Sequence, residues 1–189
     1  MEETLIKYLG AQFTMIDKIM INCDYIFRHN QEQYKKTPNI SNSDYLRYLA
    51  SVISDDIIVN LYKLLKASQD FSFQSFNSKV KHFIEQEGYK FKTREREDFF
   101  NKYMTTLEEL LNLYQRINWE GIRNKYVGHL DKKRLAIRFE LDDLKVIQIS
   151  LLNIKDYLHK SFYDIEPIEH RSPLIELIED NIKLKELLE

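Results

Sequence analysis

The clearest helical pattern of the chain lies in residues 93–117, which read TREREDFFNKYMTTLEELLNLYQRI. Acidic residues follow Thr93 in the first turns, where the positive end of a helix dipole favours negative charge. Beyond them, apolar side chains recur every three or four positions, at Phe100, Tyr103, Leu107, Leu110, Tyr114 and Ile117. This period predicts a long amphipathic helix that buries one face.

Similar stripes occupy most of the remaining sequence. They predict helices from about Leu5 to Lys36, from Asp44 to Lys66, from Phe73 up to Gly88, and from Leu141 to Leu158. Thr37-Pro38 should end the first helix, because the residue before a proline avoids the helical conformation. Ser41 and Asp44 resemble a capping box at the start of the second.

Glycine and proline are scarce, with four and three in the chain, so few positions interrupt these helices. We therefore expect an all-α, up-and-down helical bundle over residues 1–163. A short extended piece is expected at Leu135–Phe139. Residues 164–189 contain two prolines and then an amphipathic stretch from Leu174 to Leu188. We expect a C-terminal helical extension there, which docks on the bundle or on a partner.

The bulk properties fit one domain with a real core, since the chain has 189 residues of which 43% are hydrophobic. The net charge is −2, which argues against a broad basic face for duplex nucleic acid. The single cysteine, Cys23, excludes an internal disulfide and fits a buried thiol in a reducing cytoplasm. No apolar run resembles a signal peptide or a membrane span, so we expect a cytoplasmic protein.

The sequence lacks the common motifs for nucleotide binding and metal binding. No Gly-Lys-Ser/Thr loop, His-Glu-x-x-His or Glu-x-x-His occurs, and no cofactor or metal is expected. The nearest match, Asp156-x-x-His159, has no matching partner helix. His82, His159 and His170 are isolated, and we interpret them as surface or interface residues.

Residues 123–131, RNKYVGHLD, carry the strongest candidate chemistry. The guanidinium of Arg123 suits a phosphate, and the imidazole of His129 suits proton transfer near neutral pH. The preceding helix should continue into this segment with a kink near Gly121. Gly128 can adopt a left-handed conformation that ends the helix and lets His129 turn back, while Asn124 offers a donor and an acceptor. Alternatively, Arg123 pairs with a helix carboxylate and His129 caps a helix end.

An arginine, a polar residue and then a histidine at this spacing, after a long helix in an all-α bundle, resemble the signature of the HEPN superfamily. The sequence of residues 123–131 is similar to the corresponding segment in HEPN proteins of the abortive-infection U type. The resemblance implies metal-independent ribonucleases, often toxins or phage-defence effectors, that form homodimers with both Arg/His pairs in one cleft. It makes Arg123 and His129 the catalytic candidates and Asn124 their support. One subgroup has a tyrosine where Asp131 stands here, so regulation through that tyrosine does not transfer.

The leading hypothesis is therefore an endoribonuclease in which the 2′-hydroxyl of RNA attacks the adjacent phosphate. His129 would transfer the proton and Arg123 would stabilise the charge on the phosphoryl oxygens, leaving a 2′,3′-cyclic phosphate. The alternative is a non-catalytic HEPN-like module for dimerisation or partner binding, such as an antitoxin-controlled subunit. A third hypothesis is a helical scaffold unrelated to this superfamily.

Basic residues next to the pair are candidate RNA contacts: Lys125, Lys132, Lys133 and Arg134. In a dimer the loop of residues 132–134 would lie at the rim of the cleft and hold the RNA backbone. The alternative is a solvated turn. On the second helix, Asp55, Asp56 and Asn60 lie off the apolar stripe. They form either a solvated face or a supporting layer for the Arg/His pair.

Overall fold

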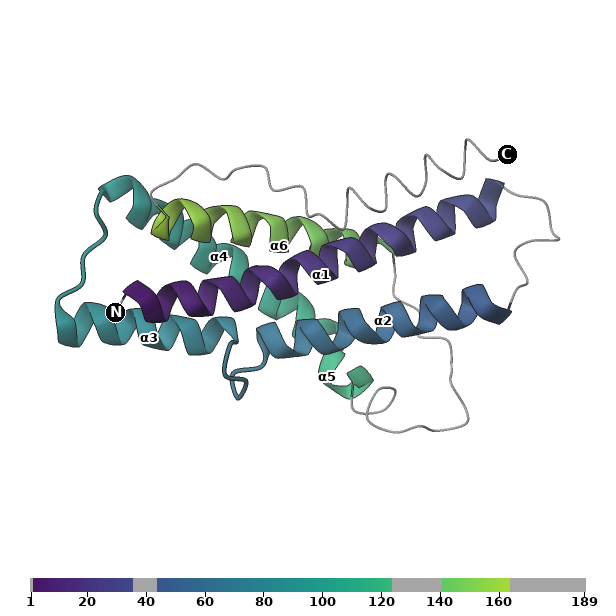
Figure 1. The fold of residues 1–189 in the computed structure, drawn as a ribbon, viewed down its shortest axis with the longest axis horizontal. Coiled ribbons are helices and arrows are strands. Elements are labelled where there is room, and N and C mark those ends of the chain that lie inside the picture. The colour runs from purple at the N-terminus through teal and green to yellow at the C-terminus, as the bar shows by residue number, and fades with distance from the viewer. Residues whose placement is uncertain (1, 36–43, 124–140, 164–189) are drawn as a thin grey trace.

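The computed structural model describes residues 2–35, 44–123 and 141–163, which form helices joined by short loops, with no strand among them (Figure 1). The elements are α1 (Glu2–Lys35), α2 (Asp44–Leu65), α3 (Phe73–Glu87), α4 (Arg94–Ile117), α5 (Trp119–Ile122) and α6 (Leu141–Phe162). The all-α prediction is confirmed. The expected extended piece at 135–139 and the extension at 164–189 lie outside the described residues.

Along the described chain, α1, then α2 with α3, then α4, and then α6 run in alternating directions (Figure 1). α2 and α3 follow one another along one line, beside α1, and α4 and α6 complete the bundle. The Arg116–Asp143 ion pair joins the end of α4 to the start of α6, at 3.3 Å. At the opposite ends of the same two helices, the rings of Phe100 and Phe162 lie 5.8 Å apart. α4 and α6 are therefore antiparallel, as an up-and-down bundle requires.

One face of each long helix supplies the core. The fully buried side chains on α1 and α6 recur at helical spacing: Leu9, Ile16, Ile19 and Cys23 on the first, and Leu144, Leu151, Ile154 and Leu158 on the second. Burial raises the pKa of the Cys23 thiol to about 12, with a further contribution from Asp24. The predicted buried thiol is confirmed.

Short polar contacts fix where the helices begin and end. The hydroxyl of Thr93 accepts a hydrogen bond from the Arg96 backbone N–H, which starts α4 at the predicted position. α3 ends at Gly88, whose φ of 69° is the left-handed conformation that glycine adopts without strain. The fully buried Gln12 of α1 donates to the backbone oxygens of Phe71 and Ser72, which holds the α2–α3 loop against α1.

Aromatic rings close one end of the bundle. Phe162 of α6 contacts Phe76 of α3 at 5.5 Å, Phe91 of the α3–α4 loop at 5.6 Å, and Phe100 of α4. Tyr103 packs against Phe76 and donates its hydroxyl to Asn77 at 2.8 Å. We call these five rings the aromatic end. They bring together helices that are far apart in the sequence.

The other end of α4 differs from the prediction. We expected the helix to continue with a kink near Gly121, but α4 ends at Ile117. Asn118 adopts a left-handed conformation, with φ 56° and ψ 46°, which breaks the helix three residues earlier. Asparagine tolerates this conformation better than most residues because its short amide bonds locally with the backbone. We call residues 118–123, which follow the break, the α5 end.

Candidate functional site

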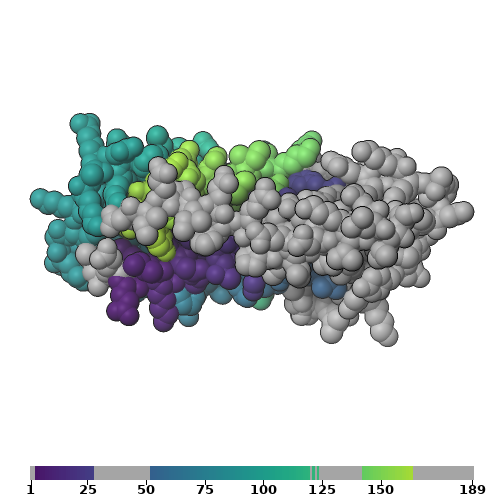
Figure 2. Space-filling model, turned by 45° about the horizontal axis from the view of Figure 1, so that its top comes forward, coloured from purple at the N-terminus to yellow at the C-terminus, as the bar shows by residue number. Residues whose placement is uncertain are grey.

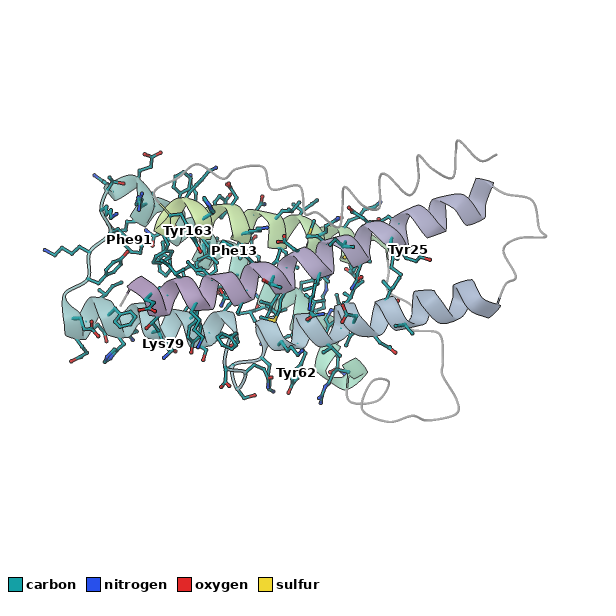
Figure 3. The ribbon with its side chains drawn as sticks, viewed as in Figure 1. Phe13, Tyr25, Tyr62, Lys79, Phe91 and Tyr163 are labelled. Atoms are coloured by element: carbon teal, nitrogen blue, oxygen red, sulfur yellow. The ribbon has the colours of Figure 1, made fainter. Side chains whose placement is uncertain are left out.

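Arg123, the first residue of the candidate motif, directly follows α5 and is half-buried. Its guanidinium carbon lies 4.7 Å from the centre of the Tyr62 ring on α2. Figure 3 shows Tyr62 on the side of α2 that faces α5. A guanidinium over an aromatic ring is attracted by the negative face of the ring, and more strongly when both are partly shielded from water. The structure thus gives Arg123 a defined support on another helix.

The single turn of α5 determines where Arg123 emerges. The Asn118 side-chain oxygen accepts the Gly121 backbone N–H at 3.3 Å and caps this turn. A Cβ at Gly121 would lie 2.6 Å from the Asn118 amide nitrogen, so glycine leaves room for the cap. Trp119, 1% exposed, anchors the turn in the core. One cap and one buried ring therefore orient the segment that leads into the motif.

The polar residues of α2 that were candidates for a supporting layer include Asn60 and Asp56, and Asp56 contacts α1. Asn60, predicted to lie on a solvated face or in a supporting layer, is 5% exposed, and its amide donates to the Asp56 backbone oxygen at 2.9 Å. The exposed Asp56 carboxylate accepts a hydrogen bond from Asn22 of α1 at 2.7 Å. The Asp56 side chain thus ties α2 to α1. The solvated-face interpretation is wrong for Asn60.

The remaining motif residues lie outside the described residues: Asn124, Lys125, His129, Lys132, Lys133 and Arg134. The convergence of Arg123 and His129 therefore stays a prediction. Of the candidate site residues, Arg123 alone falls in the described part of the chain. The sequence does not point to Tyr62 as its support, because a tyrosine on an amphipathic helix usually belongs to the core. No local pattern marks a ring that lies under a cation from a distant segment.

A second aromatic contact involves a histidine far from the motif in sequence. The ring of His159 stacks on Tyr163 at 4.7 Å with an interplanar angle of 10°. The Phe13 ring of α1 lies 6.5 Å from the His159 ring and 6.2 Å from the Tyr163 ring, and Figure 3 shows Phe13 next to Tyr163. Partial burial lowers the pKa of His159 from its ordinary value of 6.5; Asp156 opposes this shift, and Lys155 and Lys160 add to it. The His159 side chain is thus half-buried and packs against the Tyr163 ring. The exposed His82 agrees with its interpretation as a surface residue.

Within the described ranges, no group of three or more His, Cys, Asp or Glu side chains could hold a metal ion. None of the helices in these ranges is both long and apolar enough to cross a bilayer. No protein-family model, curated protein or solved structure matches the chain. The features that point to a function are therefore the sequence of residues 123–131 and the contact of Arg123 with Tyr62.

Proposed function

We propose that this chain is a metal-independent endoribonuclease of the HEPN type. In the proposed reaction the RNA 2′-hydroxyl attacks the neighbouring phosphorus, and the bond to the 5′-oxygen of the next nucleotide breaks. His129 acts in proton transfer, and Arg123 stabilises the negative charge on the phosphoryl oxygens. Asn124 supports the pair. The products carry a 2′,3′-cyclic phosphate and a 5′-hydroxyl.

The position of Arg123 is the observation that carries this proposal. The guanidinium carbon lies over the face of the Tyr62 ring, 4.7 Å from the ring centre. A cation–π contact leaves the positive charge of the guanidinium in place, and this charge attracts phosphate, so the contact with Tyr62 is compatible with phosphate binding. An arginine whose guanidinium is already held against a ring loses less side-chain freedom when it binds phosphate, and a preorganised cation stabilises developing charge best. These features support a phosphate-binding role for Arg123.

The proposal also covers the oligomeric state of the protein and its role in the cell. One Arg/His pair offers few groups to bind a nucleotide, whereas two pairs that face each other double the cationic groups around one phosphate. We therefore propose a two-fold homodimer whose motifs share one cleft. By the same resemblance, the protein acts in the cytoplasm as a toxin or phage-defence effector, with an antitoxin as a further partner.

The basic residues beside the motif complete the proposed site. Lys125 and the loop of Lys132, Lys133 and Arg134 would bind phosphates without reading sequence. The matching test replaces the three loop residues by alanine. RNA affinity should fall and depend less on salt, because fewer counterions are released, while bound RNA is cleaved at the wild-type rate. Unchanged affinity and salt dependence would assign the loop to a solvated turn.

A non-catalytic module is the second candidate, and the same contact favours it. Arg123 on Tyr62 also ties the α5 end to α2, which is what a structural arginine does. If that is its whole role, Arg123→Ala lowers the melting temperature and wild-type protein leaves RNA intact. The two candidates thus differ in what the wild-type protein does to RNA.

The test compares wild-type protein, His129→Ala and His82→Ala on a labelled single-stranded RNA. Loss of a general acid/base costs about 10²–10⁴-fold in rate. We expect that loss in His129→Ala and wild-type rates in His82→Ala, whose histidine is exposed on α3. All three proteins pass through the same purification, so His129→Ala also reports contaminating ribonuclease. Equal rates in all three proteins would refute the enzymatic proposal.

A further inference from the structure

α6 carries an apolar face that the described bundle leaves uncovered. Its inner face is buried through Leu144, Ile147, Leu151, Ile154 and Leu158. On its outer face, Val146 is 50% exposed, Ile149 is 59% exposed and Leu152 is 48% exposed. Residues three apart on a helix are neighbours, so these side chains form one continuous patch. We call them the α6 outer stripe.

Other exposed apolar side chains of the described chain do not form such a row. Ile6, Val52, Ile84 and Met104 each lie on a different helix, α1 to α4 in that order. Single exposed apolar residues are normal on protein surfaces, whereas contiguous patches mark interaction sites. Figure 2 shows a face of the molecule on which atoms of α6 (green to yellow) reach the surface next to those of α4 (teal). The stripe is therefore a candidate docking surface.

The chain itself supplies an occupant of the right chemistry. The described residues end at Tyr163, one residue after α6, and 26 residues follow it. Within them, apolar side chains recur at helical spacing: Leu174, Leu177, Ile178, Ile182, Leu184 and Leu188. An apolar row of this length has no partner within its own segment and must be buried against another surface.

The connection is long enough to reach the stripe. From Tyr163 back to Val146, the helix covers about 26 Å. Residues 164–173, if extended, span up to about 33 Å. We propose that residues 174–188 fold back along α6 and cover the α6 outer stripe in the same chain. This inference does not depend on the proposed ribonuclease function.

A second copy of the chain is the competing occupant. A segment joined to its binding surface by ten residues acts at an effective concentration of about millimolar. At micromolar protein, the tethered segment therefore covers the stripe in preference to another molecule. This difference in concentration dependence makes the two occupants experimentally separable.

The test uses cysteine pairs in the full chain and a short bismaleimide cross-linker, which tolerates small errors in register. The pair Ile149→Cys with Ile178→Cys reports on the stripe. The pair Ile84→Cys with Ile178→Cys is the control, because Ile84 is also exposed and lies on α3 near the end of the bundle where α6 ends. The native Cys23 is buried, with a pKa of about 12, and does not compete at neutral pH.

We expect intramolecular cross-linking of the stripe pair at least about tenfold faster than of the control pair, since docking raises the local concentration. Equal rates for the two pairs would overturn the proposal. Cross-linked dimers of Ile149→Cys alone, formed as fast as the intramolecular product, would also overturn it and assign the stripe to a second copy. As an independent check, Ile149→Asp and Ile178→Asp should not be additive in the melting temperature, whereas additive losses would contradict the contact.

Discussion

The aromatic end and the α5 end are held together in different ways. At the aromatic end, rings from α3, α4, α6 and the α3–α4 loop each contact several others, so the stability of this end comes from many contacts. At the α5 end, the contacts that orient the motif include the Asn118 cap on the Gly121 N–H and the Arg123 guanidinium over the Tyr62 ring. A side chain buried among several rings is costly to remove. A polar contact contributes less, but it determines where a functional group points.

This difference predicts separate phenotypes at the two ends. Substitutions at the aromatic end should lower stability strongly and, in protein that remains folded, leave the chemistry of the motif unchanged. Substitutions at the α5 end should change activity more than stability.

Phe76→Ala should have the largest effect. Phe76 is fully buried and contacts Tyr103 and Phe162, so its removal leaves a cavity between three helices. We expect a loss of about 3–5 kcal/mol in the free energy of unfolding. Urea unfolding followed by circular dichroism measures it. A loss below about 1 kcal/mol would mean that the aromatic end is loosely packed.

Asn118→Ala should cost less and act locally. It removes the cap on the Gly121 N–H and places alanine in a left-handed conformation, for a combined loss of about 1–2 kcal/mol. Asn118→Gly keeps the backbone conformation and loses only the cap, so it should be the milder substitution. Thermal unfolding of both variants decides the order. If Asn118→Gly is the more damaging, the left-handed conformation is not what makes Asn118 important.

Tyr62→Leu should reduce RNA cleavage by roughly 2- to 30-fold, because a cation–π contact contributes about 0.5–2 kcal/mol. Tyr62→Phe retains the ring and should restore cleavage. Tyr8→Leu is the matched control, since Tyr8 also lies under a cation, Lys79 at 5.3 Å, on another part of the surface. Single-turnover rates on the same RNA measure the effect. Equal loss in Tyr62→Phe and Tyr62→Leu would show that the hydroxyl, rather than the ring face, matters.

The smallest effect concerns pH and His159. Its pKa is lowered in the folded protein, so the unfolded chain binds the proton more tightly. The stability it contributes is therefore complete above its ordinary pKa of 6.5 and is lost as the pH falls from 6.5 through the lower folded pKa. His159→Phe retains a ring against Tyr163 and should remove this part of the slope. Unfolding free energies between pH 7.5 and pH 5 in both proteins test it, and parallel curves would contradict it.

The helices could be predicted from sequence because their evidence is local. The apolar period of α4, its start after Thr93 and the end of α3 at Gly88 follow from side chains within a few residues of each position. The break at Asn118 was missed because the apolar stripe ends at Ile117 and Gly121 was the more obvious breaker. A left-handed asparagine depends on a bond between its own side chain and the next turn, which no period reveals.

The surroundings of Arg123 were harder to predict, because they involve a residue that is distant in the sequence. The sequence marked Arg123 by its spacing from His129, but its support comes from Tyr62, which is distant along the chain. Tyrosine on an amphipathic helix is usually part of the core, so nothing local distinguishes Tyr62. The solvated-face alternative is wrong for Asn60: although a polar residue off the apolar stripe is usually solvated, the Asn60 side chain is buried.

The most direct test of the central claim is the chemistry of the RNA ends. Wild-type protein is incubated with a single-stranded RNA in excess EDTA, and the products are analysed by mass spectrometry. The account predicts fragments that end in a 2′,3′-cyclic phosphate and begin with a 5′-hydroxyl, in undiminished yield and absent with His129→Ala. Intact RNA, or fragments with 5′-phosphate and 3′-hydroxyl ends, would contradict it.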